Sequence, residues 1–192
     1  MTVGLLFHGE KIELRAFEAE DIPKLHEYLN HPLLSGRRYI PWGFSDQHPL
    51  SKKNIEAIYQ KWSETKKGFN LGIKIKETNE LIGHVLSDWE WDTHSTSLAV
   101  LITPPHQRKR YGSEALTLLL NYLYGYTPAH NVNCWISDWN KEGITFAQNH
   151  GFSESGRIRR AGIRQGKYFD IIMMDILREE WKNKLRGKTD GS

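Results

Sequence analysis

Residues 107–113, QRKRYGS, carry the strongest chemical signal in this sequence. Three consecutive cations, Arg108, Lys109 and Arg110, come just before Gly112. Glycine lets a backbone approach a ligand closely, and the first N–H groups of a helix have no partner within that helix. A basic loop that opens a helix therefore predicts a binding site for phosphate. The same residues also fit a solvated basic turn before an ordinary helix, and the loop alone leaves both interpretations open.

The neighbouring residues place this loop between a strand and a helix. Residues 98–102 are all apolar and predict the end of a strand over 95–102, and Pro104 and Pro105 follow it. Residues 111–124 carry apolar side chains at helical spacing. Gly125 and Pro128 are expected to end that helix.

The same patterns assign the rest of the chain. Strands are expected at 11–17, 70–76, 81–91, 95–102, 132–136, 152–163 and 167–177, and helices at 21–30, 51–66, 111–124 and 140–151. This order predicts an α/β (α+β) fold with a mixed, mostly antiparallel sheet of about seven strands and about four helices. We expect one domain over residues 1–181 and a polar, frayed tail over 182–192.

Composition narrows the function. A net charge of +3 over 192 residues suits an anionic ligand and does not by itself indicate nucleic-acid binding. Cys134 is the only cysteine, so neither a disulfide framework nor a cysteine-based zinc site can form within one chain. Residues 1–10 lack the charged segment and long apolar run of a secretory signal, so we expect none. The sequence has no apolar run of about 18 residues and contains no compelling metal cluster. We therefore expect a cytoplasmic protein with no membrane partner and no metal.

A second segment, residues 140–152, changes the interpretation of the first. Alone, NKEGITFAQNHGF is explained as a helix that Asn140 caps and Gly151 ends. Together, and in this order, residues 107–112 and 140–152 resemble the GNAT superfamily of acetyl-CoA-dependent N-acetyltransferases. That family carries a pyrophosphate-binding loop of the form Gln/Arg-x-x-Gly-x-Gly/Ala after its fourth strand, and a later Asn…Gly-Phe segment.

The two ends of the chain extend this resemblance to about residues 11–181. Residues 12–17 with Asp21, and residues 166–181, resemble the branch that acetylates ribosomal-protein N-termini. The resemblance implies a three-layer GNAT-like fold, acetyl-CoA as the acetyl donor, and direct transfer to a primary amine in a ternary complex. The amine belongs to a protein N-terminus or to a small molecule. Dimers are common in that branch, so a homodimer is an expectation too.

The resemblance also implies which residues hold the cofactor. In the family, the pantetheine arm inserts between the fourth and fifth strands and bonds the backbone of the fourth, where an N–H can stabilise the oxyanion. The implied cofactor-binding residues are Val100, Leu101, Ile102, Thr103, Gln107, Arg108, Lys109, Arg110, Tyr111, Gly112, Ser113, Asn140 and Phe146.

This sequence departs from the family's pattern at the residues that carry its acid–base chemistry. Arg110 replaces the first glycine of the loop. Ser97 aligns with the position where the family often has a glutamate on the fourth strand. Gly143 replaces a serine of the ribosomal-protein branch, and Ala147 replaces a tyrosine of other branches. The resemblance therefore does not identify the acid or the base.

Three carboxylates are candidate replacements for the missing base. Asp88 and Glu90 share one face of the strand over 81–91, together with His84. Asp138 precedes Asn140 and could receive protons through water. Asn140 suits cofactor or water binding, because its amide does not titrate. Solvent-facing charges on a hairpin are the competing interpretation of Asp88 and Glu90.

Aromatic residues could wall the acceptor site. Trp42 and Phe44 lie in an irregular segment between two predicted helices, a region that borders the acceptor in the resembled branch. Trp89 and Trp91 share a face of their strand. A hydrophobic plug over the sheet is the competing interpretation of the segment around Trp42.

Other functions fit parts of the sequence. A non-catalytic acetyl-CoA-binding or regulatory module would explain the missing acid and base, and an antibiotic or polyamine acetyltransferase would share the cofactor loop. The basic run at 157–167 belongs to a predicted hairpin, where solvation or an acidic partner would explain it. A nucleic-acid-binding protein is disfavoured, because these arginines form no aromatic-interleaved stacking platform.

Overall fold

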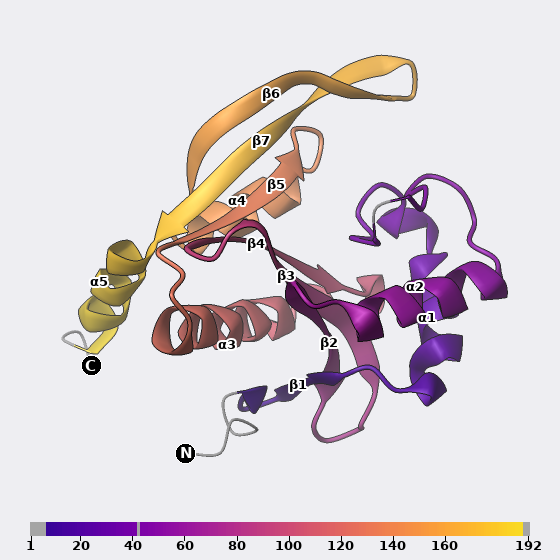
Figure 1. Ribbon diagram of the computed structural model, residues 1–192, viewed down its shortest axis with the longest axis horizontal. Coiled ribbons are helices and arrows are strands. Elements are labelled where there is room, and N and C mark those ends of the chain that lie inside the picture. Colours follow the sequence, from indigo (N-terminus) through magenta and orange to yellow (C-terminus); the bar gives the residue numbers. More distant parts are fainter. Residues whose placement is uncertain (1–6, 42, 190–192) are drawn as a thin grey trace. The chain divides into compact units, whose positions relative to one another are not determined.

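The sequence forms seven β-strands and five α-helices in a computed structural model, which describes residues 7–41 and 43–189 and leaves out the side chains of residues 90, 91 and 187–189. The strands are β1 Ile12–Ala16, β2 Gly68–Ile75, β3 Leu81–Asp92, β4 Ser95–Ile102, β5 Asn131–Ser137, β6 Ser153–Arg164 and β7 Lys167–Leu177 (Figure 1). The helices are α1 Ile22–Leu29, α2 Lys52–Glu64, α3 Tyr111–Tyr126, α4 Lys141–Asn149 and α5 Arg178–Thr189.

The strands form one sheet in the order β1-β2-β3-β4-β5-β7-β6. The pairs β1–β2, β2–β3, β5–β7 and β6–β7 are antiparallel, whereas β4 and β5 are parallel over Ser95–Ser97 and Asn131–Asn133. The predicted mixed, mostly antiparallel sheet of seven strands is therefore confirmed.

These elements group into two compact units. The first comprises Met1–Asp88 and Ala99–Tyr122, and the second comprises Trp89–Leu98 and Leu123–Ser192. Strands β3 and β4 and helix α3 each contribute residues to both units. One domain over residues 1–181 stays a prediction.

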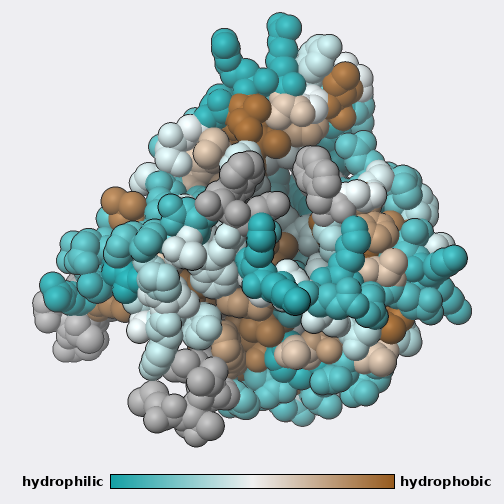
Figure 2. Space-filling view, viewed as in Figure 1, coloured by the Kyte–Doolittle hydropathy of each residue, from teal (hydrophilic) through white to brown (hydrophobic). Residues whose placement is uncertain are grey.

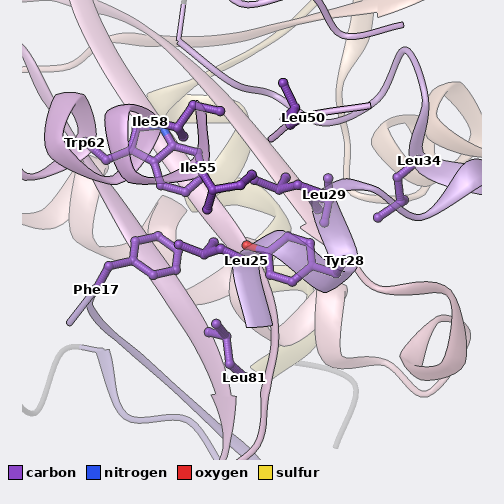
Figure 3. Packing of buried hydrophobic residues seen from close by; sticks show 11 residues of the cluster. Phe17, Leu25, Tyr28, Leu29, Leu34, Leu50, Ile55, Ile58, Trp62 and Leu81 are labelled. Carbon is purple, nitrogen blue, oxygen red and sulfur yellow. The ribbon is translucent and has the colours of Figure 1, made fainter. Parts of the chain in front are cut away.

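In the first unit, helices α1 and α2 cover one face of the sheet with a cluster of buried side chains (Figure 3). Phe17 stacks on Trp62 with ring centroids 5.0 Å apart, and Leu25 and Ile55 are fully buried. Each such side chain contributes about 1.5–3 kcal/mol when it leaves water. The apolar positions of both helices recur at helical spacing, which explains why the sequence predicts them correctly.

Helix α3 covers the other face of the same unit. Ala115 and Leu119 pack with Ile82 and Val85, whereas Leu81 belongs to the cluster under α1 and α2. Adjacent residues of a strand point to opposite faces of the sheet, so Leu81 and Ile82 pack into two different hydrophobic clusters. The unit therefore has three layers, helices on each side of a sheet, as expected.

Gly83 lets β3 lie unusually close to β4. A Cβ at this position would lie 2.0 Å from the carbonyl oxygen of Leu101, so only glycine allows β3 to approach β4 this closely. The N–H of Thr103 then donates to the carbonyl oxygen of Ile82 over 2.8 Å. This contact anchors the chain just before the basic loop.

The second unit corrects two expectations about helix ends. Helix α3 runs through Gly125 to Tyr126 instead of stopping at the glycine, and residues 182–189 belong to α5 instead of a frayed tail. Arg178 stabilises the end of α3, because its guanidinium donates to the carbonyl oxygen of Tyr124 in α3 and to those of Thr127 and Ala129 just after the helix. Trp181 is 3% exposed and holds α5 to the unit, so there are five helices, one more than expected.

The face of the molecule seen in Figure 2 is mostly polar. Figure 2 shows hydrophilic residues over most of the visible face, with hydrophobic residues in separate small patches. Among the described residues, no helix combines the length and apolarity needed to cross a membrane.

Candidate functional site

The basic loop has an unusual backbone. After the short helical turn Pro104–His106, Arg108 has φ 62° and Arg110 has φ 71°. Both are left-handed conformations, which cost a non-glycine residue about 1 kcal/mol or more. Arg110 replaces the family's first glycine, so the structure explains why glycine suits this position. Turns with such residues are the conformations from which anion-binding nests of N–H groups are built.

The loop leads into the start of α3. The N–H of Glu114 is the first to bond back into the helix, and its acceptor is the carbonyl oxygen of Arg110 at 3.1 Å. The N–H groups of Tyr111, Gly112 and Ser113 therefore precede the helical ladder. The structure brings the predicted phosphate-binding residues together at one positive helix end.

The three cations of this loop are available to a ligand. Arg108, Lys109 and Arg110 are exposed, and none of them forms a salt bridge within the described part of the chain. The charges add to the partial positive charge of the helix start, which favours an anion there. Pyrophosphate binding by this loop stays a prediction.

Hydrogen bonds hold the loop from both sides. The carboxylate of Glu114 accepts from the N–H groups of Lys11 and Ile12, at 2.9 and 3.3 Å, which ties the first turn of α3 to β1. The side-chain amide of Gln107 donates to the carbonyl oxygen of Ile102 over 2.9 Å. Gln107 thus braces the loop against β4.

The end of β4 is predicted to bind pantetheine, but some of its backbone groups already have hydrogen-bond partners within the protein. The N–H of Thr103 already donates to Ile82, and its carbonyl oxygen accepts from the N–H of His106. The Leu101 side chain is 3% exposed and belongs to the core. Among the predicted residues 100–103, Val100 and Ile102 are half-buried, so their surroundings are less closed than those of Leu101 and Thr103.

In the second unit, Asn140 caps helix α4. Its side-chain oxygen accepts from the N–H of Gly143 over 3.2 Å, and the residue is 7% exposed. A Cβ on Gly143 would lie 2.6 Å from the side-chain nitrogen of Asn140. The cap therefore explains the glycine that replaces the family's serine, and it gives Asn140 a structural role in addition to the predicted one. Phe146 packs on His150 within the same helix end, with ring centroids 4.4 Å apart.

The candidate carboxylates have different surroundings. Asp88 is exposed on β3 opposite Gly68, and Asp138 is half-buried, with its N–H donating to the carbonyl oxygen of Asp170 over 2.9 Å. Glu90 lies in β3, but its side chain is outside the described part of the structure. The roles of these carboxylates as proton acceptors stay predictions.

His84 lies in the core of the first unit rather than on a charged rim. It is fully buried, its Nδ1 lies 3.0 Å from the hydroxyl oxygen of Tyr28, and its ring centroid is 4.9 Å from that of Trp62. Burial lowers the pKa of His84 to about 4, although the nearby backbone of Tyr39 and Arg38 favours its protonated form. His84 is therefore uncharged at neutral pH.

The segment between α1 and α2 is organised by Arg38, which sequence reasoning missed. Arg38 is 2% exposed, its Nε donates to the carboxylate of Asp46 over 2.7 Å, and its other nitrogens donate to the carbonyl oxygens of Leu29, Ser45 and His48. Partners that lie seven to ten residues away along the chain leave no signal in the pair Arg37-Arg38. The arginine gives the segment a defined shape although it has no α-helix or strand of its own.

The predicted aromatic wall is described only in part. Phe44 is half-buried against the cluster of α1 and α2, and the Nζ of Lys61 lies 5.0 Å from its ring centre, an arrangement that favours the hydrophobic plug. Trp89 is half-buried on β3. Trp42 and the side chain of Trp91 lie outside the described residues.

The basic run of the β6–β7 hairpin is divided among several partners. Arg157 pairs with Glu154 and Asp170, Arg160 lies 5.4 Å from the Tyr168 ring centre, and Arg164 lies 4.1 Å from that of Trp139. Most of these partners belong to the hairpin itself. This pattern favours a solvated hairpin over a basic docking surface.

Residues 11–153 match the family described as acetyltransferase (GNAT) domain. Two proteins of Bacillus subtilis (strain 168) are each 22% identical over 175 residues. One is the SPbeta prophage-derived uncharacterized N-acetyltransferase YokL, and the match spans 91% of this chain and 94% of YokL. The other is the uncharacterized N-acetyltransferase YnaD, and the match spans 90% of this chain and 96% of YnaD.

Solved structures with the same fold include two acetyltransferases. A GNAT-family acetyltransferase from Bacillus anthracis is 21% identical with a TM-score of 0.77, over 90% of this chain and 98% of that one. A spermidine N-acetyltransferase from Vibrio cholerae, solved with CoA and spermine, is 21% identical with a TM-score of 0.76, over 90% and 99%. At this identity the likeness concerns the fold.

Proposed function

Because the chain belongs to the acetyltransferase (GNAT) domain family, we propose that it moves the acetyl group of acetyl-CoA to the primary amine of a small cationic molecule. The family membership confirms the expected N-acetyltransferase and supports acetyl-CoA as its acetyl donor. A similar fold in a spermidine N-acetyltransferase supports the small-amine acceptor. The ribosomal-protein branch, with a protein N-terminus as acceptor, stays the competing prediction.

The basic loop at the start of α3 carries this proposal. Its three exposed cations, its two left-handed residues and the N–H groups of Tyr111, Gly112 and Ser113 suit the pyrophosphate of acetyl-CoA. The bracing of the loop by Glu114 and Gln107 keeps those groups in place before the ligand arrives, which reduces the entropy lost on binding.

The transfer itself needs few groups from the protein. The neutral amine attacks the thioester carbonyl carbon, the carbonyl oxygen becomes an oxyanion, and the C–S bond breaks to release the thiolate of CoA. The amine loses one proton to a base or to water, and the thiolate takes one up. Backbone N–H groups of β4 are the proposed oxyanion donors, and alignment of the two substrates supplies much of the acceleration.

Calorimetric titration with acetyl-CoA tests the role of the loop. Replacement of Arg108, Lys109 and Arg110 by glutamine is expected to weaken binding by about tenfold or more, since each cation is exposed and contributes a modest attraction. The matched control replaces three cations of the β6–β7 hairpin, Arg159, Arg164 and Lys167, by glutamine. Equal loss of affinity in both triple variants would refute the assignment of the loop.

Release of free thiol from acetyl-CoA tests the acceptor. The panel consists of propylamine, spermidine, an aminoglycoside, and peptides with a free N-terminus. Turnover with the small amines and not with the peptides supports the proposal, whereas the reverse pattern supports the ribosomal-protein branch. Tight acetyl-CoA binding without turnover on any acceptor would favour a non-catalytic module.

A further inference from the structure

A row of polar side chains crosses three strands of the second unit. The register places Ser97 of β4 opposite Asn133 of β5, and Asn133 opposite Asp175 of β7. Ser95 likewise lies opposite Asn131. Residues directly opposite each other in a sheet share a face, so these side chains can contact one another. All five are half-buried and remain within reach of solvent.

Hydrogen bonds join these side chains into one chain. The hydroxyl of Ser97 lies 2.7 Å from the side-chain oxygen of Asn133, and the amide nitrogen of Asn133 lies 3.3 Å from the hydroxyl oxygen of Ser95. The Ser95 hydroxyl lies 3.2 Å from the side-chain oxygen of Asn131, whose amide nitrogen lies 2.7 Å from the carboxylate of Asp175. The chain therefore runs without a break from Ser97 to Asp175.

Two groups at fixed positions set the direction of every bond. The carboxylate of Asp175 only accepts, so Asn131 must turn its amide nitrogen toward Asp175. The side-chain oxygen of Asn131 then faces Ser95, whose hydroxyl must donate to it. The indole Nε1–H of Trp135 only donates, and it lies 3.0 Å from Asn133, which must therefore present its oxygen there. Both constraints agree, and each donor points toward Asp175.

The direction of the chain decides what Ser97 can do. Its single hydroxyl proton is committed to Asn133, so the oxygen has only lone pairs left to offer. Hydrogen bonds in series polarise one another, and a carboxylate at the far end strengthens the acceptor character of the first oxygen. A hydroxyl held in this way accepts a hydrogen bond from an N–H group and does not donate one.

We propose that Ser97 Oγ contacts the amine substrate by accepting a hydrogen bond from the N–H of its primary amine. The other members of the hydrogen-bond chain are positioning residues that act through Ser97: Asn133, Ser95, Asn131 and Asp175. This proposal rests on the proposed function. It places a neutral oxygen, backed by a remote carboxylate, where the family's alignment has a glutamate. The oxygen orients the amine and takes no proton from it, so the base remains a separate group.

Steady-state kinetics with propylamine or spermidine provide the main test. Ser97→Ala is expected to lower kcat/KM for the amine about tenfold, the value of one hydrogen bond to a charged or polarised group, with KM for acetyl-CoA unchanged. Ser97→Thr keeps the hydroxyl and is expected to recover most of the activity. Similar melting temperatures for the three proteins would show that folding does not cause the difference.

Asp175→Asn tests the action at a distance. The substitution keeps an oxygen for Asn131 to donate to and removes the charge, so kcat/KM for the amine is expected to fall about threefold. In a variant that already carries Ser97→Ala, Asp175→Asn is expected to cause no further fall in kcat/KM, because the charge acts only through Ser97. Asp170→Asn on the same strand is the control, since the Asp170 carboxylate accepts from the N–H of Arg160 and does not belong to the hydrogen-bond chain from Ser97 to Asp175.

Two results would overturn the inference: Ser97→Ala retaining wild-type kinetics, or Asp175→Asn lowering activity equally with and without Ser97. Failure of the proposed function is recognised separately, as a wild-type protein that acetylates no amine. In that case propylammonium is titrated into ¹⁵N-labelled protein. A shift of the Asn133 side-chain amide signals in the wild type and not in Ser97→Ala supports the contact, and no shift in either refutes it.

Discussion

The stability of this protein is expected to fall between pH 6.5 and pH 4 because of one buried histidine. His84 is fully buried beside Tyr28 and Trp62, and its Nε2 has no hydrogen-bond partner among the described residues. Burial lowers its pKa from the ordinary 6.5 to about 4. In the unfolded chain the imidazole is exposed and binds a proton at its ordinary pKa.

The size of the effect follows from these two pKa values. Above pH 6.5 the imidazole is neutral in both states and the free energy of unfolding is insensitive to it. Below pH 6.5 the unfolded chain binds a proton that the folded protein refuses until about pH 4. Since one pKa unit corresponds to 1.36 kcal/mol, the folded state loses about 3 kcal/mol over this window.

Urea unfolding at a series of pH values measures this loss. Other groups also titrate here, so the decisive quantity is the difference between the wild type and His84→Gln, which cannot bind the proton but can still bond the hydroxyl of Tyr28. From about pH 7 to about pH 4.5 the wild type is expected to lose about 2–3 kcal/mol more than the variant. The control variant His130→Gln, which changes an exposed histidine, is expected to lose as much free energy of unfolding over this pH range as the wild type. Parallel profiles for wild type and His84→Gln would refute the reasoning.

Three further predictions concern single contacts. Arg38→Met is expected to lower the free energy of unfolding by about 3 kcal/mol, measured by urea unfolding, and Arg38→Lys by less, because the buried guanidinium donates to three carbonyl oxygens and a carboxylate. Arg110→Gly is expected to be about 1 kcal/mol more stable than Arg110→Ala, since both remove the charge and only glycine relieves φ 71°; equal midpoints would contradict this. Gly143→Ala is expected to cost about 1–2 kcal/mol by displacing the Asn140 cap, whereas Gly125→Ala, where a Cβ meets nothing within 4 Å, is expected to raise the melting temperature.

Local patterns in the sequence predict most of the fold. Strand β4 over 95–102 and strand β7 over 167–177 have the bounds that alternation and turn residues predict, and Ser51 caps α2 as expected. Residues 182–189 extend a helix whose Trp181 is buried in the unit. The expected helix end at Gly125 was wrong because of Arg178, which bonds the end of α3 and the residues after it from 49 or more positions along the chain. No local pattern contains that contact.

The candidate site divides in the same way. The basic loop was identified from residue types and spacing, because a phosphate-binding turn is built from consecutive residues. Arg38, the neutral His84 and the chain from Ser97 to Asp175 were not, because each acquires its role from partners that folding brings to it. His84 shared a predicted strand face with acidic residues, and only burial showed that it is uncharged.

The sequence by itself determined the family and the expected acetyl donor, since both depend on short segments whose chemistry is local. The tertiary structure decided which polar groups are already satisfied and which still face a ligand. Asn140 is partly committed to a helix cap, Thr103 to β3 and Gln107 to β4, whereas Ser97 keeps an oxygen that can only accept. The physical reason is that a hydrogen-bonding group has few valences, and only the folded chain determines how they are used.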